Sequence, residues 1–126
     1  MQSFITTTEK SAGKVDAFIG TCLMSSTYIH SAHFATHSYS QHKALEQFYN
    51  EMPDLVDKFA ETYIGITGAY KPVLKTESNF DAVAYIRSIA ESGTEIYDSV
   101  DSCLQSIIDE IKVLCYQTIY RLTHLS

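Results

Sequence analysis

Apolar residues recur at the helical period through four stretches of the chain, with polar or glycine-containing segments between them. The first stretch predicts a helix over about residues 7–30, and the polar segment 31–41 then favours a turn or an irregular link. The second stretch predicts a helix over residues 42–64 that Gly65 ends. Because Pro53 lies inside this stretch and lacks a backbone donor, we expect it to kink the helix or to split it in two.

The second half of the chain predicts two more helices. A connection over residues 65–77 precedes a third helix, which begins at Phe80 after a cap at Ser78 or Asn79 and is interrupted near Gly93. A longer periodic segment then reaches almost to the C-terminus. Four amphipathic segments without an alternating strand pattern predict an all-α four-helix bundle, in one domain that spans residues 1–126. A strict coiled coil is disfavoured because Ser, Thr and Tyr interrupt the heptads.

Composition narrows the possible partners and compartments. The 126 residues are 45% hydrophobic, enough for one core, and carry a formal net charge of −6 with scattered basic residues, so DNA binding is not expected. The N-terminal MQSFITTTEKSAGK lacks an apolar leader, and no apolar run has the length of a membrane span. We therefore expect a cytoplasmic protein. Cys22, Cys103 and Cys115 are far apart without a C-x-x-C pair, which favours reduced packing thiols over a thiol pair or a metal site.

Four of the five histidines lie near a series of carboxylates in one stretch of the chain. His30, His42, Glu46, Asp57 and Glu61 follow the spacing H-x11-H-x3-E-x10-D-x3-E. This spacing resembles the ferroxidase motif of the mini-ferritins, the Dps-type branch of the ferritin-like proteins, over about a third of the chain. The resemblance implies a ferritin-like bundle that binds ferrous iron and oxidises it. Imidazole and carboxylate ligands also suit manganese or zinc.

Helix geometry requires that two subunits contribute ligands to this metal site. On a straight helix His42, Glu46, Asp57 and Glu61 project within about 100° of one another and so share one face, but Glu46 and Asp57 stand about 16 Å apart along the axis. One subunit therefore cannot bring them to a common metal, and the site requires at least a homodimer with two antiparallel copies of this helix. The resemblance also implies metal shared across a dimer interface. His30 joins the site only if the chain turns before His42.

The stretch departs from the mini-ferritin pattern and also has ordinary interpretations. Ser31 stands where mini-ferritins have Trp, no glycine precedes His42, and no basic N-terminal extension is present, so a closed cage and DNA binding are not implied. His42 with Glu46 can be a simple i, i+4 pair, and the later carboxylates a solvated stripe. His33 and His37 share a helical side with His30, as further metal ligands or, more commonly, as hydrogen-bonded packing residues.

A second resemblance involves the segments HKALEQFY, DLVD, IDEI and TIYRL. Together they are similar to segments of small uncharacterised proteins of tailed bacteriophages. This resemblance implies a non-catalytic helical oligomer that binds a host protein or sequesters a small molecule in the host cytoplasm. The sequence thus leaves two functions open, a ferroxidase-like metal-binding protein and a phage-type binding protein.

Overall fold

The structure is a computed structural model that describes residues 7–77 and 80–125. Helices are the regular elements of this part of the chain, and it contains no strand. The prediction of an all-α four-helix bundle is therefore confirmed. The elements are α1 (Thr7–Ala35), α2 (Tyr39–Thr67), α3 (Ala82–Ile96), a 3₁₀ turn (Tyr97–Ser99) and α4 (Ser102–His124).

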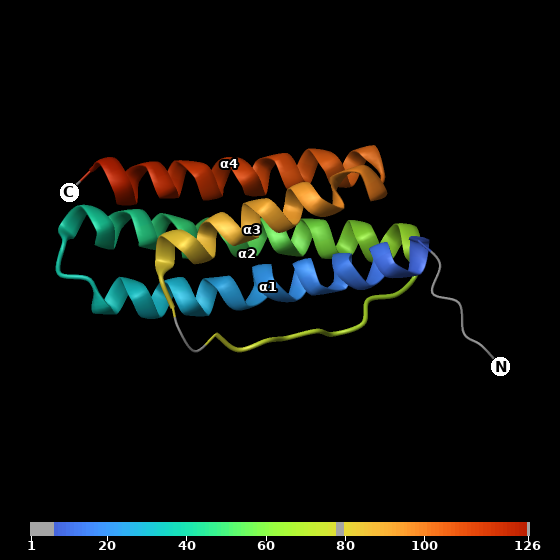
Figure 1. Cartoon of the computed structure of the whole chain (residues 1–126), viewed down its shortest axis with the longest axis horizontal. Helices are drawn as coiled ribbons and strands as arrows, with labels where there is room; N and C mark the ends of the chain where they lie inside the picture. Colours follow the sequence, from blue (N-terminus) through green and yellow to red (C-terminus); the bar gives the residue numbers. More distant parts are fainter. Residues whose placement is uncertain (1–6, 78–79, 126) are drawn as a thin grey trace.

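The four helices form a bundle in which α1 and α4 occupy opposite corners. Helix α1 packs on α2 and α3, and α4 packs on the same two helices from the other side (Figure 1). Each packed pair runs antiparallel, so α2 and α3 point the same way, and the chain must return along the whole bundle between them. This single long crossover is the connection pattern of ferritin-like bundles. A shared connection pattern carries no function by itself.

The crossover lies directly on α1 because one residue of that helix has no side chain. A Cβ atom at Gly20 would overlap the carbonyl oxygen of Val73. A second contact anchors the same connection, since the backbone N–H of Glu77 donates to the hydroxyl oxygen of Tyr28 at 2.6 Å. Glycine at position 20 is thus required by the close approach of the backbone.

The core is built from the apolar faces that the helical periodicity predicts. Phe48 and Phe59 of α2 and Ile108 of α4 are fully buried, and the ring of Phe18 meets Phe59 edge-on at a centroid distance of 5.3 Å. Burying each such side chain contributes about 1.5–3 kcal/mol. This apolar layer, more than local propensity, holds the helices together.

Helix α2 runs unbroken through Pro53, so the helix is not split in two there, and the predicted kink stays a prediction. Proline removes one backbone hydrogen bond, whereas Met52 and Val56 on either side of it are buried in the core. Tertiary packing therefore outweighs the local cost. The helix also passes Gly65 and ends at Gly68, whose φ of 87° is the left-handed conformation of a C-cap glycine.

The start of α3 and its predicted interruption also differ from the structure. The predicted caps Ser78 and Asn79 lie outside the described residues, and α3 begins after Asp81, whose carboxylate accepts from the backbone N–H of Ala84 at 3.2 Å. Gly93 does not interrupt α3. It is buried, and a Cβ there would approach a methyl group of Ile108 at 3.1 Å, so this glycine serves the packing of α3 on α4.

Candidate functional site: an aromatic corner between α1 and α2

The link between α1 and α2 brings two histidines into contact. Helix α1 ends at Ala35, and Ser38 caps α2 by accepting from the backbone N–H of Gln41 at 3.3 Å. The chain therefore turns between His30 and His42, as the proposed metal site required. Because α1 extends past residue 30, however, the residue that reaches His42 is His33.

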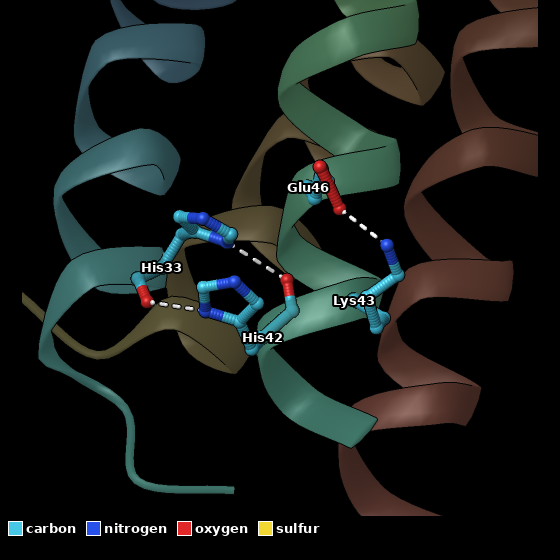
Figure 2. Close-up of polar contacts among 4 residues, drawn as sticks. All are labelled: His33, His42, Lys43 and Glu46. Carbon is cyan, nitrogen blue, oxygen red and sulfur yellow. Dashed lines mark hydrogen bonds and ion pairs between the residues drawn. The ribbon is translucent and has the colours of Figure 1, made fainter. Parts of the chain in front are cut away.

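His33 and His42 are joined by two reciprocal hydrogen bonds (Figure 2). Nδ1 of His33 donates to the carbonyl oxygen of His42 at 2.8 Å, and Nδ1 of His42 donates to the carbonyl oxygen of His33 at 3.2 Å. The rings stack with centroids 3.5 Å apart. Since a carbonyl oxygen only accepts, both Nδ1 atoms carry a hydrogen and donate it to the backbone. His33 is buried, which confirms its interpretation as a hydrogen-bonded packing residue.

Three further rings extend this pair to the surface. His30 stacks on Tyr49 of α2 at 4.0 Å and on Phe34 at 4.8 Å, and His33 meets Tyr49 edge-on at 5.2 Å. Phe34 is 75% exposed although it is one of the larger apolar side chains. We call His30, His33, Phe34, His42 and Tyr49 the aromatic corner.

Glu46, one turn after His42, is engaged by a lysine. Its carboxylate lies 2.9 Å from Nζ of Lys43 in an ion pair within the first turns of α2 (Figure 2). The hydrogen bond and charge of Lys43 lower the pKa of Glu46, and the nearby rings of His33 and His42 act in the same direction more weakly. Glu46 therefore stays ionised beside the histidine pair.

The five predicted metal ligands do not converge within one subunit. His42 and Glu46 lie at the aromatic corner, His30 is stacked against Tyr49, and Asp57 and Glu61 are exposed farther along α2. In the described part of the chain, no three His, Cys, Asp or Glu side chains are grouped so that they could hold a metal ion. A site shared between two subunits stays a prediction.

Sequence reasoning did not identify Phe34 and Tyr49 as part of the site. Phe34 follows His30 by one helical turn, a spacing at which side chains meet on one face. The spacing alone could therefore have predicted the contact between His30 and Phe34. The position of Tyr49 depends on how α1 and α2 pack, which no local pattern contains. His37, the other histidine considered as a metal ligand or packing residue, is exposed in the link between α1 and α2.

The cysteines differ in environment. Cys22 and Cys115 are buried and unpaired, and burial raises the pKa of both thiols, that of Cys115 to about 12. Their predicted packing role is confirmed. Cys103 is exposed near the start of α4, so the same prediction is wrong for that residue. Cys103 lies two residues after the cap residue Asp101, whose carboxylate accepts from the backbone N–H of Cys103 at 3.0 Å.

Comparison with known proteins places the chain in a family. The sequence profile of a family of unknown function, DUF5856, matches residues 33–122. The chain belongs to this family. The match begins at His33, so this DUF5856 member carries its histidine pair inside the family region, whereas His30 lies before it.

One relative of this DUF5856 member comes from a bacteriophage. An uncharacterised 14.6 kDa protein in the mobD-ri intergenic region of Enterobacteria phage T4 is 38% identical over 113 residues, which cover 87% of this chain and 88% of the relative. The resemblance to phage proteins is thus supported, and neither match is to a mini-ferritin. No solved structure matches the chain. No helix of the described residues has the length and apolar character to cross a membrane.

Proposed function

We propose that this DUF5856 member is a non-catalytic helical protein that binds a host protein through the aromatic corner. The observation that supports this function is Phe34, a phenyl ring that is 75% exposed and yet stacked on His30. An aromatic side chain held in place before binding loses little conformational entropy when a partner covers it. Such residues commonly anchor protein interfaces.

The charge of the chain indicates the kind of partner. Asp54, Asp57 and Glu61 are exposed on α2 beyond the aromatic corner, and the whole chain has a formal net charge of −6. An apolar pocket with basic residues at its rim would complement this surface. The relative from Enterobacteria phage T4 supports a partner in the bacterial host, and hence a site of action in the host cytoplasm.

The two buried thiols and the histidine pair support binding over covalent catalysis. A thiol acts as a nucleophile in its ionised form, and burial raises the pKa of Cys22 and Cys115. In the histidine pair, each Nδ1 donates to a backbone carbonyl group rather than to a carboxylate. No acid–base relay is thus formed by these contacts.

Site-specific photo-crosslinking tests this function. The photoreactive residue p-benzoylphenylalanine replaces Phe34, or in a control Leu74, which is 60% exposed on the crossover. Each variant is irradiated in an enterobacterial extract. We expect one adduct of discrete mass from position 34 that is absent from position 74, competed by unlabelled wild-type protein and not by Phe34→Asp. An adduct that both competitors remove equally, or no adduct, would refute the proposed surface.

Transition-metal binding is a second candidate function, favoured by one feature of the histidine pair. A metal-ligating histidine commonly donates its other ring N–H to a carbonyl oxygen, and Nδ1 of His42 does so, which leaves Nε2 as the nitrogen that could bind a metal. Ferrous iron, manganese or zinc would then raise the melting temperature. Glu61→Ala should abolish that rise if two subunits share the site, and Asp98→Ala, outside the motif, should not. No rise with any of these metals would exclude this candidate.

A further inference from the structure

The outer face of α4 carries a stripe of large apolar side chains that no other helix of the described chain covers. Val113, Tyr116 and Tyr120 are 54%, 46% and 56% exposed, and His124 stacks on Tyr120 with a centroid distance of 5.3 Å. The i, i+3 and i+7 spacing puts these residues in one line, on the side opposite Ile108, Ile111 and Cys115, which face the core. We call Val113, Tyr116, Tyr120 and His124 the α4 stripe.

Charge is distributed unequally along this helix. Asp109 and Glu110 lie one turn before the apolar part of the stripe, whereas Arg121 and His124 lie at its other end. A second α4 that runs parallel in register would put acidic residues beside acidic residues. An antiparallel second α4 would put the acidic end of each helix beside the basic end of the other, which is favourable.

We propose that the α4 stripe is a homodimer interface, in which two copies of α4 pack antiparallel about a two-fold axis between Tyr116 and Gln117. In this register Val113 lies opposite Tyr120 of the second copy, and Asp109 lies opposite His124 of the second copy. Glu110 keeps its ion pair with Lys58 of its own chain at 3.1 Å, so the contact between Asp109 and His124 carries the charge complementarity. One self-complementary surface thus brings opposite ends of the two helices together and buries its own aromatic residues.

The surface beside the stripe has a cleft for this contact. It has a volume of about 350 Å³, lies between α2 and α4, and is lined in part by Leu55, Val113 and Gln117. Because Tyr120 of the second copy reaches the level of Val113, its ring can enter this cleft. One helix pair with three large side chains per copy gives an interface at the small end of the known range, consistent with a micromolar dimer.

This interface differs from the one that the ferroxidase motif predicts. That dimer would pair two copies of α2, whereas the α4 stripe lies on the helix diagonally opposite α1 (Figure 1). The aromatic corner includes three residues of α1. A dimer through α4 therefore leaves Phe34 of both copies accessible to a partner, and the two surfaces can be tested independently.

Disulfide trapping tests both the interface and its direction. In a Cys103→Ser background, Gln117→Cys puts two thiols next to the two-fold axis, whereas Ser102→Cys on the same exposed side puts them about 44 Å apart. We expect mild oxidation to give a cross-linked dimer from Gln117→Cys only. Cross-linking of both variants to the same extent would contradict the antiparallel direction, and cross-linking of neither would refute the interface.

Sedimentation measures the dimer without cross-links. The wild type should sediment as a dimer at tens of micromolar, and Tyr120→Asp should shift the protein to monomer with at least a tenfold larger dissociation constant. Leu74→Asp, an apolar-to-acidic change at a similarly exposed site, should leave the dimer intact. Unchanged helical circular dichroism shows that each variant is folded. A wild-type monomer at these concentrations, or equal effects of both substitutions, would overturn the proposal.

Discussion

Replacing His33 with alanine tests whether the histidine pair stabilises the junction of α1 and α2. The ring of His33 is buried, donates one hydrogen bond to His42 and stacks on its ring. A hydrogen bond of this kind contributes about 1 kcal/mol, an aromatic contact about 0.5–1.5 kcal/mol, and the cavity left by the ring adds to the loss. We expect His33→Ala to lower the free energy of unfolding by about 2–3 kcal/mol.

Urea denaturation followed by helical circular dichroism measures this change, with an m-value equal to that of the wild type. His37→Ala is the matched control, because His37 is exposed in the link and should change stability by less than about 0.5 kcal/mol. Equal effects of the two substitutions would refute the stabilising role of the pair. A loss below about 0.5 kcal/mol for His33→Ala would refute it as well.

Three more predictions concern other parts of the fold. Gly20→Ala should destabilise the protein in urea by about 1–3 kcal/mol because its Cβ overlaps the crossover, whereas Gly13→Ala, with open space around it, should stabilise by about 0.5–1 kcal/mol. A thiol reagent should modify Cys103 quickly in the folded protein and Cys115 only after unfolding, as counted by absorbance, since burial raises the pKa of Cys115 to about 12. The backbone N–H of Cys103 lowers the pKa of Asp101 in the folded state, so this cap stabilises α4 above the pKa of the unfolded state and loses its effect as pH falls through the folded value. Urea titrations should therefore show that Asp101→Ala destabilises at pH 7 and that its difference from wild type shrinks in acid.

The helices were predictable because each buries a continuous apolar face, and that face leaves a 3.6-residue period in the sequence. The boundaries were less predictable. Pro53 and Gly93 are helix breakers by local preference, but Pro53 has buried neighbours and Gly93 sits against Ile108. Packing between helices, which a local pattern does not contain, outweighs both preferences.

The candidate site was predictable only in part for a related reason. The i, i+4 spacing puts His42 and Glu46 side by side on α2, independent of how the helices pack. Which histidine of α1 meets His42 depends on where α1 ends, and the helix continues to Ala35 through a segment rich in residues that favour turns. His33 therefore takes the position that the motif assigns to His30.

The most direct test of partner binding is the dissociation constant of the host protein recovered by cross-linking at position 34. It is measured by titration calorimetry with purified wild type, Phe34→Asp and Leu74→Asp, each shown to be folded. We predict that Phe34→Asp weakens binding at least tenfold while Leu74→Asp matches the wild type, because only Phe34 belongs to the aromatic corner. Equal affinity of Phe34→Asp and the wild type would contradict the proposed function.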